Sequence, residues 1–277
     1  MENKIYPCFW MNGTAPAAAR FYQQVFTDTQ IVDENPMVVV IHSAGQQFMF
    51  LDAGPKFKIN ASISIYVHFT DEEELTASWD KLMEEGVAHV ALGSYDWSPK
   101  FGWVEDKYGI NWQMGLGKPE DVEMKFSPFF TFTGQTFGRA EEAVGYYTSI
   151  FPDSGVRGIL KQRHVPEAEK ETVLHAQFTL CNQVFMAIDS AFQHPFQFDE
   201  GVSLVINCAD QKEIDFFWEN LTLGGEESMC GWLKDKFGVR WQVVPFNIGQ
   251  LMHEKGNKAM EALLSMRKID MDLLMQL

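Results

Sequence analysis

The chain has 277 residues, of which 46% are hydrophobic and 22% are charged, a composition typical of a globular protein with room for about two domains. Its formal net charge of −16 repels nucleic-acid phosphates, so nucleic acid is excluded as a natural partner. The four cysteines form no Cys-x-x-Cys pair and no window approaches the roughly 18 apolar residues of a membrane span, so we expect a cytoplasmic protein with reduced thiols and no membrane partner.

Two pairs of amphipathic helices are predicted. The first begins at Thr14, a suitable capping residue, has Pro16 in its first turn, and ends near Phe26 with one apolar stripe. The same stripe returns 125 residues later. A second pair is predicted over residues 71–86 and 210–225, each with acidic residues in its first turn. Since each stripe is reproduced, we expect it to face a core in both copies.

Short runs of β-forming residues lie between and around these helices. Hairpin turns are predicted at Gly45-Gln46 and at Asn182-Gln183. After Pro245 the spacing of apolar residues predicts one or two terminal amphipathic helices within 257–277. The predicted strands span residues 37–43, 47–52, 62–69, 173–181, 184–189 and 202–208.

A long internal repeat implies two similar domains. Residues 101–113 return 129 positions later as residues 230–242, and both read Gly-Trp-x-x-Asp-Lys-aromatic-Gly-x-x-Trp-Gln. The spacing from Asp106 to Gly109, repeated in the second copy, is typical of a tight turn whose glycine takes a positive φ. About ten residues around 90–100 have no counterpart, and the second copy is longer between 153 and 175. One edge strand or loop should therefore differ between the halves.

Several segments together resemble one known family. They are Pro7-Cys8-Phe9-Trp10, the run 57–60 ahead of a strand, the repeat itself, and residues 238–245. These segments resemble the PhnB-like branch of the glyoxalase, bleomycin-resistance and dioxygenase superfamily, also called the vicinal oxygen chelate superfamily. The resemblance covers nearly the whole chain in tandem. It implies an α+β fold of tandem glyoxalase-like domains, each of paired βαβββ modules with a curled, mainly antiparallel sheet around a cavity.

The resemblance also implies a domain plan. We expect a first glyoxalase-like domain over 1–117, a linker over 118–125, a second domain over 126–246 and a C-terminal helical tail over 247–277. The two domains would then act as an intrachain pseudo-dimer, with a further homo-oligomer as an additional possibility.

A divalent metal is usual in this superfamily, held by His and Glu side chains from facing strands. Carried over to this chain, the ligand positions fall near Pro7, near Ser62 or Val202, and at Gln113 or Gln242. Proline cannot coordinate through its side chain and a neutral amide is a weak donor. We therefore expect no cofactor, with a divalent metal as the alternative.

Members of the branch are often labelled 3-demethylubiquinone 3-methyltransferase. The sequence has no glycine-rich turn between a strand and a helix with an acidic residue about 20 positions further on, the arrangement that holds a nucleoside cofactor. We do not expect methyl transfer.

Aromatic and amide residues are the candidates for a ligand site. Tryptophans flank the repeated turns, and His175 and Gln177 alternate along one strand, where they share a face. A lone strand histidine is more often part of the hydrogen-bonded structure, and large aromatics often fill cores. The candidate ligand-binding residues are Trp10, Trp103, Trp112, Gln113, His175, Trp232, Trp241 and Gln242.

These patterns favour a protein that binds a small, partly aromatic molecule in a pocket lined by a sheet, and they leave open whether it is an enzyme. One alternative is a lyase or dioxygenase of the same superfamily, with a metal on residues such as His175 and Gln242. The other is a resistance protein that sequesters a cationic drug, which the acidic balance permits.

Overall fold

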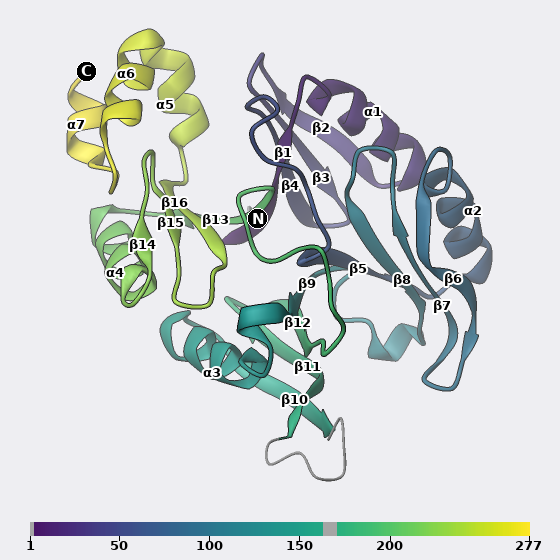
Figure 1. The fold of residues 1–277 in the computed structure, drawn as a ribbon. Coiled ribbons are helices and arrows are strands. Elements are labelled where there is room, and N and C mark those ends of the chain that lie inside the picture. The colour runs from purple at the N-terminus through teal and green to yellow at the C-terminus, as the bar shows by residue number, and fades with distance from the viewer. Residues whose placement is uncertain (1–2, 163–170) are drawn as a thin grey trace. The chain divides into compact units, whose positions relative to one another are not determined.

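The computed structural model describes residues 3–162 and 171–277, which form two compact units (Figure 1). One unit runs from Pro7 to Val202. The other comprises Ser203–Leu277 together with the first residues of the chain. Within the described residues, no helix is long and apolar enough to cross a lipid bilayer.

Two groups of four strands come from the two ends of the chain. Their strand orders are β1-β4-β3-β2 and β14-β15-β16-β13. In each group of four, the first and last strands pair in parallel and the remaining pairs are antiparallel, as in a βαβββ module. The strands are β1 (Ile5–Met11), β2 (Thr29–Glu34), β3 (Val38–Ser43), β4 (Gln46–Asp52), β13 (Val202–Cys208), β14 (Glu226–Glu227), β15 (Trp232–Lys234) and β16 (Arg240–Pro245).

The β5–β12 sheet lies wholly within the middle of the chain. Its order is β10-β11-β12-β9-β5-β8-β7-β6, with β5 and β9 pairing antiparallel at its centre. Again the first and last strands of each module, β5 with β8 and β9 with β12, are parallel neighbours. The strands are β5 (Ile63–Phe69), β6 (Val87–Tyr95), β7 (Ser98–Glu105), β8 (Asn111–Leu116), β9 (Phe126–Phe132), β10 (Gly155–Gln162), β11 (Thr172–Leu180) and β12 (Gln183–Asp189).

The β5–β12 sheet does not follow the two halves of the repeat. It joins one module from each half, β5–β8 from the first and β9–β12 from the second. Residues 118–125, expected to link two domains, connect β8 to β9 within one sheet. The α+β fold and the paired modules are confirmed, but similar modules have similar edges, and the repeat alone does not specify which module pairs with which.

Within residues 3–162 and 171–277, helices cover one face of the β5–β12 sheet. α2 packs on β5, β7 and β8, and α3 packs on β10, β11 and β12. In the other unit, α4 packs on β15 and β16. The helices are α1 (Ala15–Val25), α2 (Glu72–Leu82), α3 (Ala140–Ile150), α4 (Gln211–Thr222), α5 (Ile248–Lys255), α6 (Asn257–Ser265) and α7 (Met271–Gln276).

The first helix begins where expected but is capped differently. Thr14 occupies the N-cap position, yet its side chain makes no capping hydrogen bond. The carboxylate of Asp52, at the end of β4, instead accepts from the backbone N–H groups of Thr14 and Ala15 at 3.1 and 3.2 Å. Asp189, at the end of β12, does the same for Gly138 and Ala140 before α3. At the start of both α1 and α3, a carboxylate at the end of a strand thus accepts from two backbone N–H groups that have no partner within the helix.

The hairpin turns lie one residue earlier than predicted. Ser43 pairs with Gln46, and Leu180 pairs with Gln183, so the two-residue turns are Ala44-Gly45 and Cys181-Asn182. All four turn residues have positive φ, between 44° and 81°. Tight hairpins require this conformation at both central positions. The sequence identifies Gly45 and Asn182 as turn residues, but it does not show whether the residue before or after each one is the second turn residue.

The unequal hairpins of the two halves are as predicted. The segment around residues 90–100 forms the long β6–β7 hairpin, whereas its counterparts β14 and β15 have two and three residues. The insertion expected between 153 and 175 falls partly on residues 163–170, outside the described part of the chain.

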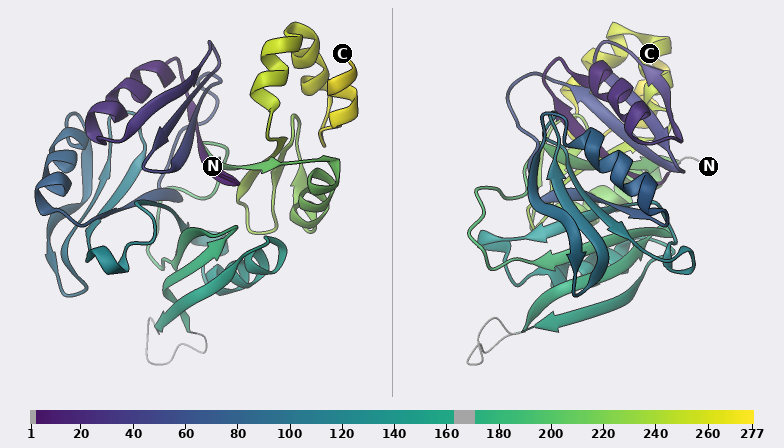
Figure 2. Two further views of the ribbon diagram at one scale, coloured as in Figure 1. Left: turned by 180° about the vertical axis from the view of Figure 1, so that it is seen from behind. Right: turned by 90° about the vertical axis from the view of Figure 1, so that its right-hand side faces the viewer.

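Two helices, α6 and α7, lie within 257–277, where one or two were predicted, and α5 precedes them. Figure 2 shows them in yellow at the C-terminus. Gly256, with a φ of 59°, separates α5 from α6. α5 lies within the helical tail expected over 247–277, and Leu251 is its buried residue.

The turn between β7 and β8 is built around a buried carboxylate. Asp106 is 3% exposed, and its Oδ2 accepts from the Tyr22 hydroxyl at 2.7 Å and from Trp112 Nε1 at 2.8 Å. Its Oδ1 accepts from the backbone N–H groups of Tyr108 and Ile110. Burial raises the pKa of Asp106, and these four hydrogen bonds oppose the rise. One side chain therefore ties α1 to the turn and to β8.

The second copy repeats this turn within its own unit. Asp235 accepts from Trp241 Nε1 at 2.8 Å and from the N–H groups of Phe237 and Val239. Gly109 and Gly238 have φ values of 85° and 94°, as the spacing predicted. The structural role expected for the repeated aspartates is confirmed.

Replacing Asp106 with asparagine should destabilise the protein by about 2 to 4 kcal/mol, because an NH2 group would face the two donors, Tyr22 and Trp112. Urea unfolding measures this. The control is Asp96→Asn, on the exposed β6–β7 connection, for which we expect a change within about 0.5 kcal/mol. Equal stability of the two variants would show that the carboxylate does not tie these elements together.

Candidate functional site

Strand alternation gives the β5–β12 sheet a polar face on the side without helices. In β5, Ile63, Ile65, Val67 and Phe69 are buried beneath the helices, so the intervening side chains point to the opposite side. These intervening residues are Ser64, Tyr66 and His68. We call this side of the sheet the helix-free face.

The register extends the helix-free face over three neighbouring strands. Ser64 pairs with Phe129 and Tyr66 with Ser127, which places Ser127, Phe129 and Thr131 of β9 on this face. Phe129 pairs with Met186 of β12, and Met186 pairs with Gln177 of β11. The alternating residues of β11 on this face are therefore His175 and Gln177.

On the other side of β5, β8 contributes an amide. Gln113 is 6% exposed, and its Nε2 donates to the Ser64 hydroxyl at 2.9 Å. Two residues further on, Gly115 leaves room for the Tyr66 side chain. A Cβ atom at this glycine would lie 1.9 Å from the Tyr66 hydroxyl oxygen. Any larger residue at position 115 would displace the tyrosine.

Six polar side chains of this face have no hydrogen-bond partner within the described residues. Ser127 and Thr131 are fully buried, with unsatisfied hydroxyl groups. The other four are half-buried. Since buried polar groups in proteins are nearly always paired, the two buried hydroxyl groups are unusual. The set consists of Tyr66, His68, Ser127, Thr131, His175 and Gln177.

The titratable groups of this set are neutral at physiological pH. Burial and the neighbouring His175 lower the pKa of His68 to about 4. Burial also lowers the pKa of His175, and it raises the pKa of Tyr66 to about 12.

Aromatic rings lie among these polar groups. The Tyr66 and His68 rings are 4.5 Å apart between centroids, and Phe129 lies 6.1 Å from His175. Tyr66 also stacks on Phe101 of β7 at 6.3 Å. Flat apolar surface and hydrogen-bonding groups therefore occur together, a combination typical of small-molecule sites.

The structure places the other predicted residues of this unit apart from the set. Trp103 is half-buried on β7 and pairs with Gln113, and its Nε1 donates to Asn111. Trp112 is 2% exposed and packs against Tyr22 and Phe26 in the core on the helix side. Trp10 donates to the Gly54 carbonyl at 2.7 Å. Of the predicted residues, Trp103, Gln113 and His175 share the helix-free face.

In the other unit, the predicted residues repeat part of this pattern. Gln242 is 5% exposed and donates to Ser203 at 2.9 Å, just as Gln113 donates to Ser64. Trp241 is fully buried beside Asp235, and Trp232 is half-buried on β15. The Ser–Gln pair is thus a repeated feature of the two modules.

The partnerless side chains, in contrast, belong to one sheet only. The register that aligns Ser64 with Ser203 aligns Tyr66 with Val205, His68 with Asn207 and Gly115 with Val244. Similarly, Gln177 of β11 pairs with Met186 of β12, and Val40 of β3 pairs with Met49 of β4. This register aligns Gln177 with Val40 and therefore His175 with Val38. Where β5 and β11 carry tyrosine, imidazole and amide groups, the equivalent strands carry mainly valine.

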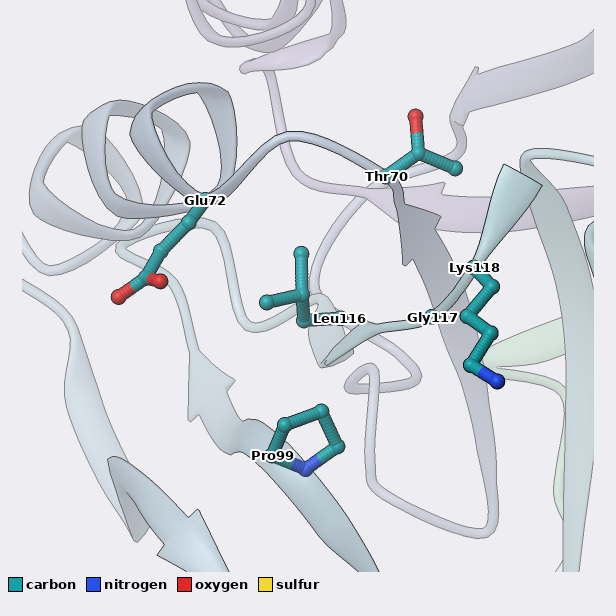
Figure 3. Close-up of a pocket in the computed structure, with 6 residues that line it drawn as sticks. All are labelled: Thr70, Glu72, Pro99, Leu116, Gly117 and Lys118. Atoms are coloured by element: carbon teal, nitrogen blue, oxygen red, sulfur yellow. The ribbon is translucent and has the colours of Figure 1, made fainter.

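A separate hollow lies at the ends of β5 and β8. It has a volume of about 490 Å³ and is lined by Thr70, Glu72, Pro99, Leu116, Gly117 and Lys118 (Figure 3). Glu72, at the start of α2, is already paired with Lys100 Nζ at 2.9 Å. None of the residues predicted from the sequence lines this hollow.

The residues present do not fit a catalytic metal. Within the described residues, no group of three or more His, Cys, Asp or Glu side chains is arranged to hold an ion. At the positions where the superfamily carries a last-strand ligand, Gln113 and Gln242 are engaged with serine hydroxyl groups. His68 and His175 are two strong donors, one fewer than a catalytic zinc site takes from the protein.

Comparison with protein families settles the relationship. The model of the 3-demethylubiquinone-9 3-methyltransferase family matches residues 3–115 and 124–244. The chain belongs to this family. The two matched segments correspond to the two halves of the repeat, and the PhnB-like resemblance is confirmed. A comparison with curated proteins finds no match.

Three solved structures are similar to this chain. The PhnB protein of Bacillus cereus, described as a 3-demethylubiquinone-9 3-methyltransferase, is 32% identical, with 42% of this chain and 100% of that chain covered and a TM-score of 0.40. Glyoxalase I from Zea mays is 10% identical over 91% of this chain and 95% of that chain, with a TM-score of 0.57. A Bacillus subtilis protein that carries a dioxygenase name is 9% identical, with 96% and 97% covered and a TM-score of 0.53. The last two show that the tandem fold is glyoxalase-like.

The low pKa of His68 predicts acid sensitivity. In the unfolded chain His68 is protonated below about pH 6.5, whereas in the folded protein it is protonated only below about pH 4. The free energy of unfolding therefore decreases as the pH falls through this window. His68→Asn introduces the residue found at position 207. Between about pH 7 and pH 5, the free energy of unfolding of this variant should fall by about 2 kcal/mol less than that of the wild type. Urea unfolding at the two pH values measures the difference. His253→Asn, at an exposed position, is the control, and equal losses in all three proteins would contradict the assignment.

Proposed function

We propose that this protein binds a small, partly aromatic molecule on the helix-free face of the β5–β12 sheet, without a catalytic metal. The observation that carries the proposal is the set of six polar side chains without partners. The buried hydroxyls of Ser127 and Thr131 cost free energy because they have left water without a partner. A ligand that pairs with the set would offset this cost.

The difference between the two sheets supports the same proposal. The folds of the modules are alike, and valine at positions 38, 40 and 205 is compatible with them. Folding alone therefore does not require His175, Gln177 or Tyr66 at the equivalent positions. A function specific to the β5–β12 sheet accounts for their presence there.

Within this site we assign roles by chemistry. Tyr66, His68, His175 and Gln177 are half-buried and available to a ligand, and Phe101 and Phe129 lie beneath them as apolar surface. Gln113 is held by Ser64 and limits one side of the site. Trp103 is a contact at the β7 side. We assign Trp112 and Trp241 to the cores of their own units. We assign no ligand-binding role to Trp10, Trp232 or Gln242.

A metal-dependent lyase or dioxygenase is the principal alternative. It gains one observation, the presence of two imidazoles, His68 and His175, on the helix-free face. It lacks the acidic ligands with which such a pair usually completes a site, and we rank it second.

We also propose that the protein is located in the cytoplasm and that it can associate further with copies of itself.

The chain itself supplies the substitutions that test the proposal. His175→Val and Gln177→Val give β11 the side chains that β3 has at the equivalent positions. Because each removes an unpaired polar group, we expect the double variant to be as stable as the wild type or more stable, by up to about 1 to 2 kcal/mol. We expect its affinity for a neutral aromatic probe, 2-naphthol, to fall at least about tenfold, equivalent to about 1.4 kcal/mol.

Calorimetric titration measures the affinity, and urea unfolding measures the stability. His253→Val, on the exposed side of α5, is the matched control and should alter neither quantity. A destabilised double variant with unchanged affinity would assign His175 and Gln177 to the structure rather than to a ligand site.

A further inference from the structure

The helix-free face restricts the charge of the molecule that it can bind; this step rests on the proposed binding function. Strands β5, β8, β9, β11 and β12 are described along their whole length, and they place no Lys, Arg, Asp or Glu on this face. Asp189, the one charged residue of β12, points to the helix side and caps α3. The centre of the face is therefore uncharged.

The charged residues of the flanking strands are engaged elsewhere. Glu105, at the end of β7, lies 3.5 Å from His89 Nε2 and 3.4 Å from Asn111 Nδ2. On β10, Arg157 pairs with Glu123, and Lys161 with Glu141 of α3. Arg157 and Lys161 therefore offer no free counter-charge to a ligand on the helix-free face, and Glu105 lies at its β7 edge with polar partners of its own.

The polar groups that remain suit neutral partners. The hydroxyls of Tyr66, Ser127 and Thr131 donate and accept, and a neutral imidazole or an amide also offers both functions. Such groups match the hydroxyl and carbonyl groups of an uncharged molecule. An ion placed among them would lose its hydration without gaining an opposite charge, which is costly.

We propose that the ligand is an uncharged aromatic molecule bearing hydroxyl or carbonyl groups, and that the site rejects ions of either sign. An anion would require a protonated His68, whose pKa near 4 keeps it neutral under physiological conditions. A cation finds no carboxylate on β5, β8, β9, β11 or β12, and Glu105 at the β7 side already lies 3.5 Å from His89 Nε2. Sequestration of a cationic drug is therefore not favoured at this site, despite the net charge of −16.

Three probes of equal ring size test the inference: 2-naphthol, 2-naphthoate and 2-naphthylmethylammonium. We expect calorimetric titration at neutral pH to show that 2-naphthol binds at least about tenfold more tightly than either ion. We also expect this preference to disappear in the His175→Val/Gln177→Val variant. The His253→Val variant should keep the preference of the wild type.

The outcomes separate the two proposals. If either ion binds as tightly as 2-naphthol and its binding is weakened in the double variant, the site exists but the charge inference is wrong. If no probe binds the wild type more tightly than the double variant, the proposed function fails, and the inference fails with it.

Discussion

The alternation of side chains across the β5–β12 sheet is the constraint on which this site depends. Helices α2 and α3 seal one face, and every apolar side chain that points toward them contributes to the core. The other face receives the intervening residues, whatever their chemistry. A one-residue slip of β5 would exchange Ile65 for Tyr66 and remove both the core and the site.

Buried carboxylates help to fix that register. Asp106 holds the turn between β7 and β8 and joins it to α1, while Asp189 holds α3 against the end of β12. Both accept several hydrogen bonds, so the cost of burying the charge is shared among strong interactions. The strands that carry the polar face are anchored in this way at both sides of the sheet.

Much of the fold could be predicted from the sequence because it rests on local periodicity. The helical stripes ending at Phe26 and Phe151 and the repeated Asp–Gly turns have unambiguous spacing. The pairing of modules could not be predicted, because it depends on long-range contacts between similar edges. The capping role of Asp52 was missed for the same reason, since Thr14 offered a local alternative.

The site was predicted only in part. His175 and Gln113 were identified, but Tyr66, His68, Ser127 and Thr131 were not, because no motif or repeat marks them. A signal existed in β5, whose sequence Ile-Ser-Ile-Tyr-Val-His-Phe alternates strictly, whereas the equivalent β13 reads Val-Ser-Leu-Val-Ile-Asn-Cys. Aligning the two strands would have exposed the tyrosine and the histidine as additions to a shared framework. Whether those additions face a solvent-free core or a ligand depends on the three-dimensional packing.

The most direct test of the central claim is the response of the histidine rings to a ligand. In NMR spectra of protein with isotopically labelled histidine, addition of 2-naphthol should shift the ring signals of His68 and His175 and leave those of His42 and His253 unchanged. This result would place the ligand on the helix-free face of the β5–β12 sheet. Unchanged His68 and His175 signals at saturating 2-naphthol would contradict the account.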